Sequence, residues 1–245
     1  MSPTPTASTT AYGETEYWNK RYASESAPFD WYQKYSALAP LLQFYIPTCS
    51  RVLVVGCGNS AFSEGMVEDG YEDVVNVDIS SVVIEAMQRK HSGCPQLKYM
   101  QMDVRDMSAF QSRSFDAVCD KGTLDSILCG NNSQENAARM LHEVERVLKD
   151  NGVYLLITYG SPAYRWCLLK ETCAWTVRLH VIEKGLSEES PNSMSWEVTK
   201  PVPLNDEGCS LEAATGLKNS DVHYIYVCTR GVSPRVITAS ETADD

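Results

Sequence analysis

The chain has 245 residues, 43% of them hydrophobic, and a formal net charge of −11. Its length and composition predict one globular α/β domain, and no apolar run approaches the roughly 18 residues of a membrane span. Because the charge is acidic and no basic stripe is present, binding to a nucleic-acid backbone is not expected, whereas a basic protein is a suitable partner.

The N-terminal part of the predicted domain is rich in aromatic residues. Residues 1–11 are rich in Ser, Thr and Pro, fit neither a secretory signal nor a transit peptide, and are expected to be a disordered tail. The single domain is expected to span 12–230, beginning with the aromatic segment at 12–47. In it, Trp18 and Tyr22 are four residues apart and would share a helix face.

Apolar runs alternate with helical patterns through the middle of the chain. A helix at 36–45, stopped by Pro47, precedes the first of these runs. The strand-like runs are at 51–55, 74–77, 97–102, 115–119 and 153–158. Helical patterns follow Ser80, a capping residue, and cover 135–149. Such alternation predicts parallel strands joined by crossover helices on both faces of a doubly wound sheet.

The C-terminal part lacks a clear crossover helix. Two more strand-like runs, at 175–182 and 222–229, are joined by a long polar insertion at 183–221. Strands joined in this way can pair antiparallel. We therefore predict a mostly parallel sheet of seven strands with an antiparallel strand at its C-terminal end, followed by a disordered tail at 231–245.

The nine cysteines give no sign of a disulfide framework or a metal site. Their number is odd and none has the Cys-x-x-Cys spacing. We expect reduced thiols, no bound metal and a cytoplasmic location.

A nucleotide site is indicated at the ends of the first two strands. The turn Gly56-Cys57-Gly58-Asn59-Ser60 follows the apolar run at 51–55, and Asp78 ends the next run. Glycines let the backbone approach a ligand closely, and a carboxylate at this place can accept hydrogen bonds from ribose hydroxyls. Read literally, Gly56-x-Gly58-x-x-Ala61 also fits a dinucleotide fingerprint, so an NAD-binding oxidoreductase is an alternative.

The end of the third strand favours an adenosine without a pyrophosphate. There, Asp103 can accept a hydrogen bond from an adenine amino group, and the Val104 N–H can donate to a ring nitrogen. A ligand held at ribose and base is thereby favoured over a dinucleotide.

At this point the chain resembles the class I, seven-stranded S-adenosylmethionine-dependent methyltransferases. Over about residues 12–160 it is similar to one group among them, the methyltransferase-like lysine methyltransferases of translation elongation factor 1-alpha. The motifs that carry this resemblance are Glu16-Tyr17-Trp18-Asn19-Lys20-Arg21-Tyr22, Ala27-Pro28-Phe29-Asp30-Trp31, Val52-Leu53-Val54-Val55-Gly56-Cys57-Gly58-Asn59-Ser60, Val77-Asp78-Ile79-Ser80-Ser81-Val82-Val83, Met102-Asp103-Val104-Arg105 and Phe115-Asp116-Ala117-Val118-Cys119-Asp120-Lys121-Gly122-Thr123-Leu124-Asp125.

The resemblance implies a Rossmann-like methyltransferase fold, S-adenosyl-L-methionine as cofactor, and a role for each matching position. It places Trp18, Tyr22 and Trp31 over the cofactor, Gly56 at its methionine end, Asp78 with Ile79 at the ribose, Asp103 with Val104 at the adenine, and Lys121 beside the methionyl portion. The alternatives are structural: Trp18 and Tyr22 could pack on the core, and Lys121 could be a surface lysine paired with Asp120 or Asp125.

The catalytic residue is not identified by the sequence. A substrate lysine with a pKa near 10.4 is only about 0.1% free amine near neutral pH, so the site must desolvate it or accept its proton. Asp120, Asp125, Tyr159 and Tyr164 follow the fourth and fifth strands and are equal candidates, although Asp125 could simply cap a helix.

The implied partner is a protein substrate such as elongation factor 1-alpha, and the oligomeric state is left open. A small-molecule methyltransferase would share the cofactor half, and a non-catalytic binding module would share the fold. Five acidic residues of the insertion are expected to steer a basic partner: Glu183, Glu188, Glu189, Asp206 and Glu207.

Overall fold

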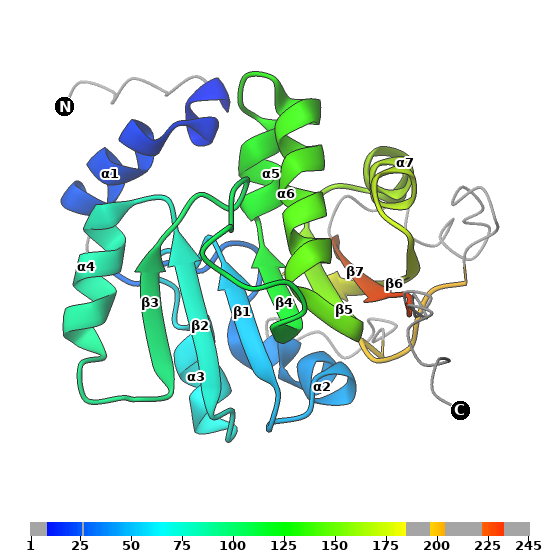
Figure 1. Cartoon of the computed structure of the whole chain (residues 1–245), viewed down its shortest axis with the longest axis horizontal. Coiled ribbons are helices and arrows are strands. Elements are labelled where there is room, and N and C mark those ends of the chain that lie inside the picture. Colours follow the sequence, from blue (N-terminus) through cyan, green and yellow to red (C-terminus); the bar gives the residue numbers. More distant parts are fainter. Residues whose placement is uncertain (1–8, 26, 185–196, 204–221, 233–245) are drawn as a thin grey trace, which may run out of the picture.

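The computed structural model describes residues 9–25, 27–184, 197–203 and 222–232, and its centre is a seven-stranded sheet (Figure 1). The strands lie in the order β3-β2-β1-β4-β5-β7-β6. Neighbours among β1 to β5 pair parallel, whereas β7 pairs antiparallel with both β5 and β6. The predicted fold class is confirmed.

The strands begin and end close to the predicted positions. They are β1 (Arg51–Val55), β2 (Asp73–Asp78), β3 (Leu97–Gln101), β4 (Phe115–Lys121), β5 (Leu148–Thr158), β6 (Trp175–Glu183) and β7 (Val222–Arg230). The largest difference is in β5, which begins at Leu148 rather than 153 because the chain enters the strand directly from the preceding helix.

Helices cover both faces of the sheet and one of its ends. They are the 3-10 helix η1 (Thr9–Gly13), α1 (Thr15–Ser24), α2 (Tyr35–Tyr45), α3 (Phe62–Glu68), α4 (Ser81–Lys90), α5 (Thr123–Leu128), α6 (Ser133–Val147) and α7 (Pro162–Thr172). As predicted, Ser80 caps α4 and accepts a hydrogen bond from the N–H of Val83 at 3.4 Å.

Two cores result from the alternation of side chains along each strand. On one face, Val52 and Val54 of β1 pack with α2, α3 and α4, while on the other Leu53 and Val55 share a cluster with α6 and α7. Because both faces are covered, β1 reads as an uninterrupted apolar run, as is usual for a buried parallel strand.

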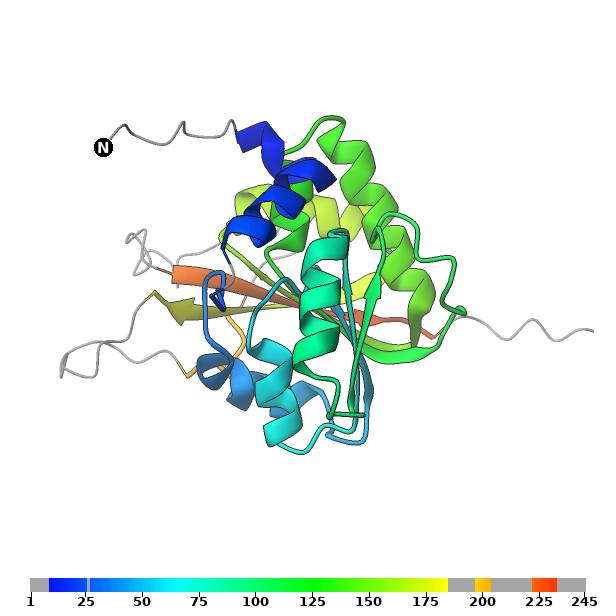
Figure 2. The same cartoon turned by 90° about the vertical axis from the view of Figure 1, so that its left-hand side faces the viewer.

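The N-terminal helices lie at the end of the sheet to which β1 to β4 point (Figures 1 and 2). Here η1 contacts α5, and α1 contacts α4. Residues 9–11, assigned to the tail from composition, belong to η1. The rest of that tail, residues 1–8, lies outside the described residues.

Much of the predicted insertion and C-terminal tail also lies outside the described residues. The described part of the insertion, 197–203, returns to the sheet, where Val202 forms a bridge with Leu179 of β6. Of the five acidic residues predicted to steer a partner, only Glu183, which ends β6, is described. Among the described helices, none is long and apolar enough to cross a bilayer.

Candidate functional site

All nine residues that the sequence assigned to the cofactor line one pocket at the carboxyl ends of β1 to β4. The pocket holds about 1140 Å³ of empty space, its open mouth included, which is enough for a nucleoside-sized ligand. The nine are Trp18, Tyr22, Trp31, Gly56, Asp78, Ile79, Asp103, Val104 and Lys121. They come from six separate parts of the chain: four of these lie at the ends of parallel strands, which all end at this edge, and α1 and the segment with Trp31 lie against the same edge.

The glycine turn after β1 forms the floor of the pocket. Gly56 and Gly58 have φ of 59° and 53°, a left-handed conformation that favours glycine. Space requires glycine as well, since a Cβ at Gly56 would lie 2.0 Å from Oγ1 of Thr123 and one at Gly58 would lie 2.7 Å from the Tyr22 hydroxyl. The backbone can therefore approach a ligand at this turn only because both side chains are absent.

Asp78 connects this turn to the end of β2. Its carboxylate accepts hydrogen bonds from the N–H groups of Gly58 and Ser80, both at 2.9 Å. Asp78 ends β2, as the sequence indicates, but it is buried there and only 6% exposed. Burial raises the pKa of its carboxyl group to about 6, although the backbone hydrogen bonds oppose the rise.

At the adenine end of the pocket, Asp103 already has a partner within the chain. Arg105 donates from Nε and Nη2 to the two carboxylate oxygens, and the shortest of these contacts is 2.6 Å. Burial acts to raise the pKa of Asp103, but the hydrogen bonds from Arg105 outweigh it and the pKa lies below its usual range. Arg105 thus fixes the carboxylate beside Val104, and the adenine contact assigned to Asp103 stays a prediction.

The aromatic residues of α1 both face the pocket and pack against each other. Trp18 and Tyr22 stack with ring centroids 5.8 Å apart, and Trp18 donates from its indole N–H to the carbonyl of Tyr12 at 2.8 Å. The guanidinium of Arg21 lies near the rings of both Phe29 and Trp31, at 5.1 and 5.4 Å from their centroids. These side chains therefore both line the pocket and pack against other parts of the protein, so one role does not exclude the other.

Lys121 is bound by the N-terminal segment rather than by the neighbours proposed from sequence. Its Nζ donates to Oδ1 of Asp30 at 3.1 Å and to the carbonyl of Trp31 at 3.2 Å. The alternative of a surface lysine paired with Asp120 or Asp125 is wrong, because its side chain is 8% exposed. Burial lowers the pKa of Lys121, and the charge of Asp30 opposes this effect.

Sequence reasoning missed two pocket residues and one group beside them. Arg21 and Arg105 line the pocket and add positive charge, while Asp30 holds Lys121 and also accepts a hydrogen bond from Ser60. All three are within the quoted motifs, but their partners could not be read from them. Asp30 and Lys121, for example, are 91 residues apart.

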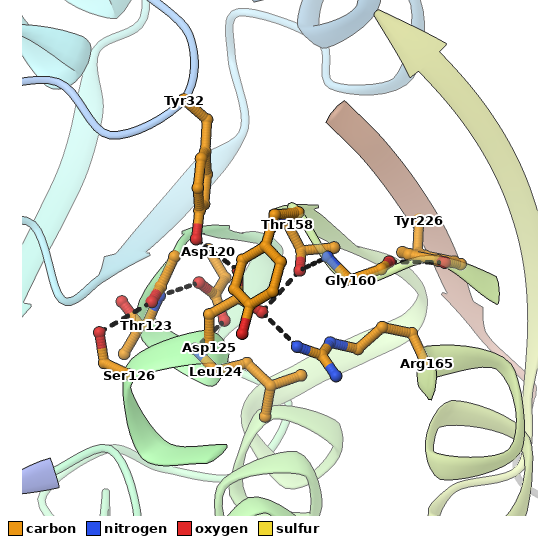
Figure 3. Close-up of polar contacts among 12 residues, drawn as sticks. Tyr32, Asp120, Thr123, Leu124, Asp125, Ser126, Thr158, Gly160, Arg165 and Tyr226 are labelled. Carbon is orange, nitrogen blue, oxygen red and sulfur yellow. Dashed lines mark hydrogen bonds and ion pairs between the residues drawn. The ribbon is translucent and has the colours of Figure 1, made fainter. Parts of the chain in front are cut away.

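The four candidate catalytic residues separate into two buried and two exposed groups. Figure 3 shows the polar contacts of the two buried ones, Asp120 and Asp125. Asp120 accepts hydrogen bonds from Thr123 N–H, Leu124 N–H and the Tyr154 hydroxyl, so it is Asp120 that caps the first turn of α5. Burial raises the pKa of Asp120 to about 7.

The other buried candidate, Asp125, is 3% exposed and ion-paired with Arg165 at 2.7 Å. Tyr159 and Tyr164 are 53% and 75% exposed. Burial and the nearby Asp125 raise the pKa of Tyr159, which makes its phenol a poor proton acceptor near neutral pH.

Comparisons with known proteins agree with this geometry. Residues 53–156 match a family described as a methyltransferase domain. EEF1A lysine methyltransferase 4 of Bos taurus is 39% identical over 164 residues, which cover 63% of this chain and 64% of that protein. The human eEF1A lysine and N-terminal methyltransferase is 38% identical over 181 residues, covering 70% of this chain and 25% of that protein. The chain thus spans less than two thirds of the length of either relative.

A solved SAM-dependent methyltransferase from Methanosarcina mazei has the same fold, with a TM-score of 0.55. It is 18% identical and covers 79% of this chain and 98% of its own. Residues 53–156 therefore match a methyltransferase domain, and the sheet has the fold of solved methyltransferases.

Proposed function

We propose that this methyltransferase-fold chain is an S-adenosylmethionine-dependent enzyme that methylates a lysine side chain of a protein, with translation elongation factor 1-alpha as its substrate. The observation that carries the proposal is the pocket in which all nine predicted cofactor residues meet. The relatives named as eEF1A lysine methyltransferases, 39% and 38% identical, support this choice of substrate.

The residues of the pocket fit S-adenosylmethionine. The glycine turn lines the pocket with backbone, and it needs glycine because a Cβ at Gly56 would meet Thr123 and one at Gly58 would meet the Tyr22 hydroxyl. Asp78, with two lone-pair positions used by backbone N–H groups, keeps acceptor capacity for ribose hydroxyls. Arg21, Arg105 and Lys121 line the pocket as cations, and each has a carboxylate neighbour in the chain.

When bound, S-adenosylmethionine supplies a methyl group on a positively charged sulfur. The rings of Trp18, Tyr22 and Trp31 suit such a cation, since an aromatic face stabilises it by about 0.5–2 kcal/mol depending on desolvation. Those rings also exclude water from the place where the methyl group moves. In-line displacement then depends mainly on positioning the donor and the amine.

The substrate amine must lose its proton before it reacts. Asp120 is fully buried and already accepts three hydrogen bonds, and Asp125 is neutralised by Arg165. Neither is free to take a proton from an incoming ammonium group. We therefore assign deprotonation to desolvation of the ammonium at the aromatic mouth of the pocket, with the proton released to solvent.

The test is incubation of the purified chain with isotopically labelled S-adenosylmethionine and purified elongation factor 1-alpha. We expect label on a lysine of the factor, identified by mass spectrometry. Incubation with a metabolite pool is the parallel experiment, and label found there alone would favour a small-molecule methyltransferase. Calorimetry should detect binding of S-adenosylmethionine, and tighter binding of NAD would overturn the cofactor assignment.

The proposal also places the enzyme in the cytoplasm, where elongation factor 1-alpha acts in translation. Fractionation of cells that express the tagged chain tests this location.

A further inference from the structure

A short segment of the N-terminal part, residues 27–33, is tied across the mouth of the pocket; we call it the cover strap. At its start, Asn59 of the glycine turn donates to the carbonyl of Ala27 at 2.7 Å. In its middle, Lys121 binds Asp30 and Trp31, as described above. At its end, Gln33 donates to the carbonyl of Glu183 in β6 at 2.8 Å.

Tyr32 is the strained member of the cover strap. Its φ is 63°, a left-handed conformation that is uncommon for a bulky side chain and is kept only when its surroundings hold it. The holding contact is the hydrogen bond from the Tyr32 hydroxyl to Oδ2 of Asp125, at 2.7 Å. The Tyr32 ring also lies 6.1 Å from the ring of Trp31, so the placement of one affects the other.

On its other side, the carboxylate of Asp125 binds the end of β5 and the start of α7 (Figure 3). Oδ1 accepts hydrogen bonds from the Thr158 hydroxyl at 2.6 Å and from Nη2 of Arg165 at 2.7 Å. Arg165 belongs to α7, and its guanidinium lies 5.8 Å from the ring centroid of the exposed Tyr159. We call this side, formed by the end of β5 and the start of α7, the rim.

We infer that Asp125 is a positioning residue that sets the cover strap and the rim relative to each other beside the pocket. Through Tyr32 it determines where Trp31, which lines the pocket, stands over the cofactor, and through Arg165 it determines where Tyr159 meets the protein substrate. This inference rests on the proposed function, because it assigns the cover strap to the cofactor and the rim to the substrate.

The chain offers a matched control for the contact with the cover strap. Tyr35 donates from its hydroxyl to Oδ2 of Asp69 at 2.6 Å, a bond of the same kind that joins the start of α2 to the end of α3. Tyr35→Phe and Tyr32→Phe each remove one hydroxyl from a tyrosine bound to a carboxylate. We expect only Tyr32→Phe to loosen the cover strap, and we expect it to raise the Kd for S-adenosylmethionine about tenfold.

The rim is tested separately with Arg165→Lys. This variant keeps the buried positive charge but loses the planar donors that hold Arg165 against Asp125. We expect KM for the protein substrate to rise at least about fivefold while the Kd for the cofactor stays within twofold of wild type. Asp125→Asn should change both quantities, since it weakens both sides of the network.

Three measurements decide the inference: calorimetry with S-adenosylmethionine, hydrogen exchange of residues 27–33, and steady-state kinetics. The inference is supported if Tyr32→Phe speeds exchange in the cover strap and Tyr35→Phe does not. It is overturned if the two tyrosine variants show equal Kd values and equal exchange. A wild-type chain that binds no S-adenosylmethionine would instead refute the proposed function, and the exchange measurement would still report on the Asp125 network.

Discussion

Replacing Asp78 with Asn should weaken cofactor binding while leaving the free chain as stable at pH 7 as wild type, or more so. The reason is that the Asp78 carboxylate is buried, and the residues that donate hydrogen bonds to it, Gly58 and Ser80, carry no positive charge. Burial raises its pKa from 3.8 to about 6. Between pH of about 4 and about 6, Asp78 therefore keeps its proton in the folded state and loses it in the unfolded state.

The sign of the pH effect follows from this difference. Because the folded pKa lies above the unfolded pKa, the contribution of Asp78 to stability is lost as pH rises from about 4 to about 6. Each pKa unit corresponds to about 1.4 kcal/mol, so the charged side chain destabilises the fold by about 3 kcal/mol at pH 7 relative to its protonated form. Asn removes this charge but replaces one acceptor with a donor, which costs about 1–3 kcal/mol.

The two effects give a net change that depends on pH. At pH 7 we expect Asp78→Asn to be between about 0 and 2 kcal/mol more stable than wild type, whereas at pH 4 it should be about 1–3 kcal/mol less stable. At pH 7 the affinity for S-adenosylmethionine should fall by about 1.5–3 kcal/mol, because a charged acceptor for the ribose is lost, whereas at pH 4, where Asp78 of the folded wild type is already protonated, the loss should be smaller.

Urea unfolding of the free protein, followed by tryptophan fluorescence at pH 4 and pH 7, measures the stability difference. Calorimetry measures cofactor affinity. A stability difference between variant and wild type that is the same at both pH values would refute the reasoning from burial. An affinity within twofold of wild type would refute the ribose assignment.

Three further predictions concern the turn, the N-terminal helices and the charge of the insertion. Gly56→Ala should lower the free energy of unfolding by about 1–3 kcal/mol and abolish cofactor binding, since its Cβ would meet Thr123. Gly93→Ala, which has open space around its Cβ, should change neither quantity, as urea unfolding and calorimetry would show. Cofactor should slow hydrogen exchange of residues 12–24, and equal exchange with and without cofactor would mean that α1 serves only to cover the core. Replacing the five acidic residues of the insertion with amides should raise KM for a basic protein substrate at low salt but not at high salt. Unchanged kinetics at low salt would mean that other residues recognise the substrate. The five are Glu183, Glu188, Glu189, Asp206 and Glu207.

The positions of the strands along the chain and the position of the pocket could be predicted from the sequence because both depend on local patterns. An apolar run such as 51–55 is buried on both faces wherever it stands in a parallel sheet, and a glycine turn after it marks its carboxyl end. Gly56, Asp78 and Asp103 each follow or end such a run, so their convergence at one edge follows from parallel pairing alone.

Short helices were harder to predict. The helix α5 has six residues, which give too few repeats for a period of 3.6 residues to be recognised. In α7, the charged Arg165 is buried together with Pro162, Trp166 and Leu169, which weakens the contrast between an apolar and a polar face.

The partners of charged and polar side chains were decided only by the tertiary structure. Lys121 pairs with Asp30 rather than with Asp120 or Asp125, and the Tyr32 hydroxyl reaches Asp125 across 93 residues of sequence. Neither contact leaves a local pattern, because it depends on how the N-terminal segment crosses the end of the sheet. Burial of Asp78 has the same origin: a residue at a strand end becomes buried only when other parts of the chain pack over that end, and its pKa changes with them.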